Sequence, residues 1–172
     1  MQSIAEKMFN LFRGNSSGHG TYAAEERSPG KVKAEIKKTA RTLRTGPSVD
    51  LWEKHLQGTT PLGVIPIMQD GTCYWGVIDV DRYDLVHADI VKKVDSVGLP
   101  AVVCRSKSGG AHIFVFFSRP IAASDLMAKL REWAAVLGYG DCEVFPKQTE
   151  VLEDRGDLGN WLNMPYFDAD QG

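Results

Sequence analysis

Three acidic residues are placed where carboxylates can bind a metal ion. Asp79 and Asp81 lie at the end of the strand-like segment 73–80, and Glu143 lies in a later apolar segment. Residues at i and i+2 of a strand face the same side, so Asp79 and Asp81 are expected to be neighbours. Two adjacent carboxylates repel each other and lose solvation near a core, and a divalent cation offsets both costs. Hard oxygen ligands favour Mg²⁺ or Mn²⁺ over zinc.

An isolated Asp-x-Asp pair also has a purely structural interpretation. In that interpretation Asp81 caps the following helix and Asp79 makes a structural hydrogen bond. The choice between the two depends on what surrounds the pair.

A polar turn between two strand-like segments favours the metal-site interpretation. It reads Arg105-Ser106-Lys107-Ser108-Gly109-Gly110-Ala111-His112. Glycines let backbone N–H groups approach phosphate oxygens, and Lys, Arg and Ser add donors. His112 can donate a hydrogen bond to a phosphate even when the imidazole is neutral. Beside a pair of aspartates, the turn predicts a triphosphate site next to a metal site. Alone, it is equally typical of a solvated hairpin tip.

The elements that must position these residues follow from apolar periodicity and turn residues. Strands are predicted at 62–68, 73–80, 101–104, 112–117 and 141–145, with a hairpin turn at Asp70-Gly71. Helices are predicted at 83–97 and 125–137, the latter capped by Ser124. Upstream, helices are expected at 1–13 and 49–56 and a loop at 15–20. From residue 73 the order is β-α-β-β-α-β.

This order predicts an α/β fold (in the α+β sense) with an RNA-recognition-like, split antiparallel sheet. Its spatial strand order is 4-1-3-2, with both helices on one face. The strand at 62–68 should extend or abut that sheet. The first strand ends at Asp79 and Asp81, and its two antiparallel neighbours begin at the same edge, with His112 and Glu143. The topology therefore predicts that three acids and a histidine converge.

The composition is that of one compact domain, and one basic segment could form a nucleic-acid-binding surface. The 172 residues are 43% hydrophobic and carry a formal net charge of -2, which fits one compact domain. The segment 27–44 nevertheless holds seven basic residues against Glu35 alone, and such a stripe can hold phosphates. The candidate DNA-binding residues are Arg13, Lys33, Lys37, Lys38 and Arg41. A solvated basic helix is the alternative.

The remaining sequence features favour an intracellular, cytoplasmic protein. No apolar run approaches the ~18 residues of a membrane span, so no membrane partner is expected. The N-terminus lacks the pattern of a secretion signal. Cys73, Cys104 and Cys142 form no Cys-x-x-Cys pair, so neither a disulfide framework nor a zinc site is predicted, and we interpret them as core residues.

Three segments resemble the motifs of archaeo-eukaryotic-type primases. They are 78–81 (Ile-Asp-Val-Asp), 108–112 (Ser-Gly-Gly-Ala-His) and 143–148 (Glu-Val-Phe-Pro-Lys-Gln). The resemblance covers about residues 62–167, including the tail segment 159–166 (Gly-Asn-Trp-Leu-Asn-Met-Pro-Tyr). It is strongest to the primase-polymerases of phages, plasmids and conflict systems, which implies a phage- or plasmid-encoded protein acting in a bacterial host.

The resemblance implies a role for each candidate residue. Asp79 and Asp81 would bind two Mg²⁺ or Mn²⁺ ions, with Glu143 as the third carboxylate. The triphosphate of an incoming (d)NTP would be held by Lys107, Ser108, Gly109, Gly110 and His112, with Arg105 and Lys147 as further phosphate contacts. The fold would be one catalytic domain over 1–172, with a helical, basic part at 1–61 and an RNA-recognition-like core at 62–172.

The partners implied by the family are a single-stranded DNA template, a primer and a helicase. Many members continue into a zinc-binding or helical module, which is consistent with this chain being a fragment of a longer primase-helicase. The implied function is that of a DNA primase-polymerase in DNA replication, a metal-dependent nucleotidyltransferase that releases pyrophosphate. Two alternatives remain open at this point: a non-enzymatic RNA-recognition-type module that binds single strands, and a metal-dependent nuclease.

Overall fold

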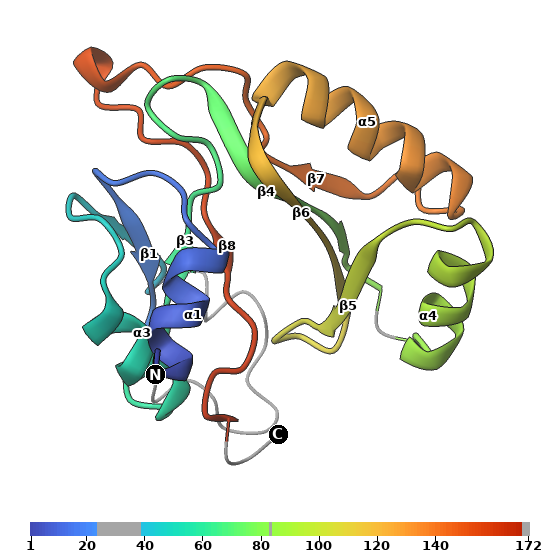
Figure 1. The fold of residues 1–172 in the computed structure, drawn as a ribbon, viewed down its shortest axis with the longest axis horizontal. Coiled ribbons are helices and arrows are strands. Elements are labelled where there is room, and N and C mark those ends of the chain that lie inside the picture. Colours follow the sequence, from blue (N-terminus) through green and yellow to red (C-terminus); the bar gives the residue numbers. More distant parts are fainter. Residues whose placement is uncertain (24–38, 83, 170–172) are drawn as a thin grey trace.

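Two four-stranded antiparallel sheets make up the sheet structure of the described residues (Figure 1). The computed structural model describes residues 1–23, 39–82 and 84–169. The first sheet has the order β2-β1-β3-β8, and the second has the order β5-β6-β4-β7. The strands of the first sheet are β1 (His19–Thr21), β2 (Arg41–Leu43), β3 (Gly63–Val64) and β8 (Leu162–Asn163). Those of the second are β4 (Thr72–Val80), β5 (Ala101–Arg105), β6 (Ala111–Ala122) and β7 (Glu143–Phe145).

The second sheet has the predicted topology. Helix α4 (His87–Ser96) connects β4 to β5, and α5 (Ala123–Val136) connects β6 to β7. The order β7-β4-β6-β5 is the expected 4-1-3-2, so this prediction is confirmed. Ile90 of α4 and Leu130 of α5 join Ile78 of β4 in one apolar core. Both helices therefore cover the same face of the sheet, as expected.

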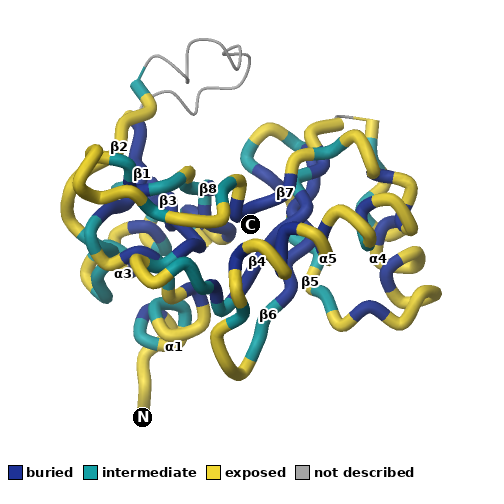
Figure 2. The backbone as a smooth tube through the Cα atoms, turned by 90° about the horizontal axis from the view of Figure 1, so that it is seen from above, coloured by how far each residue is buried: buried dark blue, intermediate teal, exposed yellow. Residues whose placement is uncertain are grey.

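The opposite face of the second sheet packs against the N-terminal unit. This unit contains α1 (Ile4–Leu11) and α3 (Val49–Leu56), whose first turns are capped by Ser3 and Ser48. Phe12, just after α1, lies 5.3 Å from the Phe114 ring of β6 and 5.5 Å from the Trp52 ring of α3. The sheet is thus covered on both faces, and Figure 2 shows buried backbone running between the two units.

The C-terminal segment returns to the first sheet. After β7 the chain passes a short 3₁₀ helix, η2 (Glu153–Arg155), and then forms β8. Asn163 of β8 pairs with Gly63 of β3, which also pairs with Gly20 of β1. Figure 1 shows this segment running between the two units. Strands β3 and β8, both within the predicted 62–172 core, therefore complete a sheet begun by the 1–61 part.

Several sequence-based expectations are corrected. The strand at 62–68 is reduced to Gly63–Val64, and it pairs in the first sheet and not beside β4. Helix α4 begins at His87 and not near residue 83. Ser124 is not a cap, because α5 already begins at Ala123. The loop predicted at 15–20 is shorter than expected, because β1 begins at His19.

Strands β1, β2 and β8 were not expected. Their two or three residues are too few for a visible alternation. Of the residues that the structure describes, none belongs to a helix with the length and apolarity needed to span a membrane.

Candidate active site

Asp79 lies at the centre of a row of polar residues across the second sheet. Its Cα is paired with His112 of β6 on one side and with Glu143 of β7 on the other. Directly paired residues place their side chains on the same face, with Cβ atoms about 4.5–5.5 Å apart. Asp81 follows one residue after the end of β4. The backbone therefore brings together the residues that the topology predicted.

The His112 imidazole is held against Asp79. Its Nε2 is 3.4 Å from Asp79 Oδ1, a distance longer than that of a strong hydrogen bond. The side chain is 6% exposed, and its ring meets the Phe114 ring edge-on at 5.6 Å. Its Nδ1 is buried and has no hydrogen-bond partner among the described residues. His112 thus keeps a buried polar atom that a ligand can satisfy.

Glu143 is aligned with Asp79 along the backbone but is engaged elsewhere through its side chain. Its Oε2 accepts a hydrogen bond from Lys147 Nζ at 2.6 Å, and the glutamate side chain is 66% exposed. The Lys147 ammonium also lies 4.6 Å from the centre of the Phe145 ring. Neither Glu143 nor Lys147 lines the pocket described below.

The carboxylates that line the pocket match only part of a divalent-cation site. Asp79 and Asp81 both line the pocket and offer the hard oxygen donors that Mg²⁺ and Mn²⁺ prefer. Across the described ranges, however, no cluster of three or more His, Cys, Asp or Glu side chains is arranged to hold a metal. Two of the three predicted ligands therefore line one pocket, whereas Glu143 is bound to Lys147 outside it.

The turn between β5 and β6 is brought close to the end of β4. The Ser106 and Gly110 backbones are hydrogen-bonded at 2.9 Å, and the Gly110 carbonyl accepts a further bond from His87 Nε2 at 2.9 Å. Gly109 has φ +94°, which favours glycine. A Cβ at Gly110 would collide with the Val80 carbonyl oxygen. Both glycines are thus required for the turn to lie against the end of β4.

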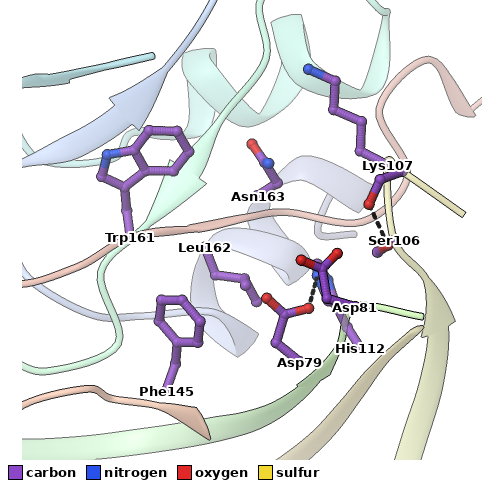
Figure 3. A pocket seen from close by; sticks show the side chains of 10 residues that line it. Asp79, Asp81, Ser106, Lys107, His112, Phe145, Trp161, Leu162 and Asn163 are labelled. Atoms are coloured by element: carbon purple, nitrogen blue, oxygen red, sulfur yellow. Dashed lines mark hydrogen bonds and ion pairs between the residues drawn. The ribbon is translucent and has the colours of Figure 1, made fainter. Parts of the chain in front are cut away.

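The pocket lies between this turn, the carboxylates and strand β8 (Figure 3). Its volume is about 170 Å³, below the roughly 300–1,000 Å³ of pockets that hold a whole drug-sized ligand. It can therefore enclose part of a nucleotide. The lining residues are Asp79, Asp81, Ser106, Lys107, Ser108, His112, Phe145, Trp161, Leu162 and Asn163.

Lys107 lies in this pocket against an aromatic ring. Its Nζ is 3.2 Å from the centre of the Tyr22 ring, a cation–π contact that holds the ammonium in place. Arg105, in contrast, is exposed and does not line the pocket. Of the predicted phosphate contacts, the structure groups Lys107, Ser108 and His112 with the carboxylates, and it leaves Arg105 and Lys147 outside.

The predicted DNA-binding residues are not gathered at the pocket. The Arg13 guanidinium lies 4.0 Å from the centre of the Tyr74 ring, and Arg41 is exposed on β2. Lys33, Lys37 and Lys38 lie outside the described residues.

The cysteines do not act as anionic ligands near the site. Burial raises the pKa of the Cys104 thiol, which lies beside His112 in the sheet. Burial, with the nearby Asp70 charge, raises the pKa of Cys73 to about 12. Both thiols are therefore protonated at neutral pH. Of the three cysteines predicted to be core residues, Cys73 is buried, whereas Cys104 and Cys142 are only partly buried.

Five pocket residues were not among the predicted site residues: Ser106 of the polar turn, and Phe145, Trp161, Leu162 and Asn163. Three of them come from or precede β8, which the sequence did not show as a strand. The one signal available was that residues 159–166 fall within the family resemblance. Trp161 and Asn163 lie across the pocket from Asp79 (Figure 3), whereas Phe145 belongs to β7, the strand paired with that of Asp79.

Comparisons with known proteins show the family and agree with the fold. Residues 12–171 match the model of a family described as the TOTE conflict system, archaeo-eukaryotic primase domain. Among solved structures, the chain is similar to the corresponding domain of the cyanophage S-2L primase-polymerase, with a TM-score of 0.50 and 14% sequence identity. That similarity covers 96% of this chain and 92% of the phage domain, and it bears on the fold alone. A search among curated proteins gave no match.

Proposed function

Because the chain belongs to the archaeo-eukaryotic primase domain family of TOTE conflict systems, we propose that it is a template-directed nucleotidyltransferase that extends a 3′-hydroxyl end. The reaction joins the hydroxyl oxygen to the α-phosphorus of a (d)NTP and releases pyrophosphate. The observation that carries this proposal is the meeting of Asp79 and Asp81 with the Ser106–His112 turn in one pocket. A nuclease needs clustered carboxylates, but it has no use for a separate triphosphate site.

Different parts of the pocket would bind the phosphates and orient the α-phosphate. Lys107 and Ser108 supply a positive charge and a hydroxyl donor for the phosphate oxygens. His112 supplies the buried Nδ1 that lacks a partner among the described residues. The fixed Gly109-Gly110 turn keeps these donors beside Asp79 and Asp81, so the α-phosphate is oriented before the reaction.

Asp79 and Asp81 would hold the divalent ions, and Glu143 would complete the site after leaving Lys147. When bound, two such ions lower the pKa of the attacking hydroxyl and neutralise charge on the leaving phosphates. The carboxylates otherwise repel one another across the sheet, and the exposed Lys147–Glu143 pair relieves part of that repulsion. A weak, exposed ion pair is readily exchanged for a stronger ligand.

The proposal also includes a nucleic-acid partner. Basic residues outside the pocket, including Arg13 and Arg41, would contact a single-stranded template through its phosphates, with little sequence preference. The family description points to a conflict system, so the expected role in DNA replication is not supported by it. That role, a helicase partner and an intracellular location remain predictions.

A primer-extension assay with labelled nucleotides tests the proposed function. Incubation with a primed template and Mg²⁺ or Mn²⁺ should lengthen the primer, and addition of a chelator should stop the reaction. Shortened strands would indicate a nuclease instead. Strand binding without either product would indicate a non-enzymatic RNA-recognition-type module.

A further inference from the structure

Trp161 is seated on a pair of glycines at the wall opposite the carboxylates. Gly20 of β1 and Gly63 of β3 are directly paired across the first sheet. A Cβ added at either glycine would collide with three ring atoms of the Trp161 indole. The indole therefore covers both glycines closely, and a side chain at either position would displace it.

The orientation of the indole is fixed further by a hydrogen bond. Trp161 Nε1 donates to Thr42 Oγ1 of β2 at 3.1 Å. One side of the ring rests on the glycine pair, the Nε1 edge is bound to β2, and the residue also lines the pocket. A large aromatic surface is thus held rigidly at the pocket wall. Rigid aromatic surfaces of this kind are what nucleobases stack on in many nucleic-acid-binding proteins.

The position of the indole suits the base end of a nucleotide. In Figure 3, Trp161 and Lys107 lie on opposite sides of Asp79 and Asp81. A nucleotide with its triphosphate at the Ser106–His112 turn would therefore direct its nucleoside toward Trp161.

Asn163 gives an independent reason to expect that this wall binds a ligand. It lies two residues after Trp161 and lines the same pocket. Its Oδ1 is buried and has no hydrogen-bond partner among the described residues. A buried acceptor without a donor is costly, and a hydroxyl or amino group of a nucleoside would satisfy it.

We propose that Trp161 is the stacking platform for the base of the incoming nucleotide, with Asn163 as a hydrogen-bond acceptor for the same nucleoside. This inference rests on the proposed function, because it takes the triphosphate to lie at the Ser106–His112 turn. It adds a base-recognising wall to a site otherwise built for phosphates and metal ions.

Binding measurements with two ligands separate the base from the phosphates. Affinities for dATP and for inorganic tripolyphosphate, both with Mg²⁺, are measured by calorimetry. Trp161→Leu should weaken dATP binding roughly 5- to 150-fold, the range expected for one stacked base. Tripolyphosphate binding should change less than about twofold. Trp133→Leu, the same substitution on α5, is the matched control and should change neither affinity.

Fluorescence tests the contact without removing the aromatic ring. Binding of dATP should quench tryptophan emission in the wild type, whereas tripolyphosphate should not. Trp161→Phe should keep dATP affinity within a few-fold and abolish the quenching, because Trp52 and Trp75 are fully buried and Trp133 lies on α5, outside the pocket. This variant keeps the test valid even if Trp161→Leu fails to fold.

Three outcomes would overturn the inference. The first is an equal effect of Trp161→Leu on both ligands, or no effect on either. The second is quenching by a single-stranded oligonucleotide but not by dATP, which would assign the platform to a strand base. The third is a wild-type protein that binds tripolyphosphate but gains no affinity from the base. Failure to bind either ligand would instead overturn the proposed function, and this inference with it.

Discussion

Replacing Asp79 with Asn should abolish nucleotide incorporation and leave the fold intact. Asp79 is the residue that the sheet places between His112 and Glu143, so the proposed metal site depends on it. Loss of a partner that merely orients a metal ligand costs about 10- to 100-fold in metal affinity or activity. Loss of a ligand itself should therefore reduce primer extension by more than about 100-fold.

The substitution should change the free energy of unfolding only slightly, because the attraction of Asp79 to His112 and its repulsion by the neighbouring acids are similar in size. Its 3.4 Å contact with His112 is long, and its side chain is 19% exposed. A cross-strand charge pair contributes about 0.2–1 kcal/mol, and the repulsion by Asp81 and Glu143 opposes it by a similar amount. The free energy of unfolding should change by less than about 1 kcal/mol. For a chain of this length, that is roughly 2–4 °C in Tm.

Thermal melts with and without Mn²⁺ complete the test. An ion present at about 100 times its Kd stabilises the folded wild type by about 2.7 kcal/mol, which corresponds to roughly 5–10 °C. Asp79→Asn should lose most of this increase. Asp95→Asn, the same change at an exposed position of α4, is the control and should keep it. Extension within tenfold of the wild type, together with an intact Mn²⁺ shift, would refute the assignment.

Three further substitutions probe other parts of the molecule. His112→Ala should raise the KM for nucleotide about ten- to a hundredfold with little change in kcat, because one hydrogen bond to a charged phosphate contributes ~1.5–3 kcal/mol. Steady-state kinetics measure this, and an unchanged KM would rule out the contact. Lys147→Gln should tighten Mn²⁺ binding up to about fivefold, since it frees Glu143 from an exposed pair of at most ~1 kcal/mol. Calorimetry checks it against Lys129→Gln, which breaks a comparable pair with Glu132. A Mn²⁺ affinity equal to that of this control would contradict the proposed competition between Lys147 and the metal ion for Glu143. Cys73→Ala should flatten the alkaline loss of stability, which denaturant titrations at several pH values follow. The folded thiol has a pKa of about 12 against an ordinary 9.0, so only the unfolded chain releases its proton between these values. The wild type should therefore lose up to ~1.4 kcal/mol per pH unit relative to the variant across that window, and parallel curves would contradict the shift.

The sequence was sufficient to predict the second sheet, because long apolar runs and their turns determine its topology. Residues 73–80 and 112–117 are nearly continuous apolar runs, as expected of strands buried on both faces, and the helices between strands show a helical period. Once the strand order is known, the pairing of Asp79 with His112 and Glu143 follows from antiparallel geometry alone. This part of the site could therefore be placed without coordinates.

The first sheet could not be predicted, because its strands are stabilised by distant partners. β1 reads His19-Gly20-Thr21 and has no apolar alternation, yet it is buried. Its glycine is explained by the indole of Trp161, which arrives from the far end of the chain. Similarly, no sequence pattern indicates that Lys147 holds the Glu143 carboxylate. Local propensity does not determine such side-chain conformations.

The late arrival of β8 has a consequence for the order of folding during synthesis. β3 leaves the ribosome long before Leu162 and Asn163, and all four strands of the second sheet are made in between. Until then β3 presents an unpaired edge, and the Gly20–Gly63 pair is uncovered. The N-terminal segment is thus not an independent folding unit, and its completion requires a contact of very large sequence separation, which slows folding. A nascent chain halted before β8 would hold a formed second sheet beside an open, association-prone first one.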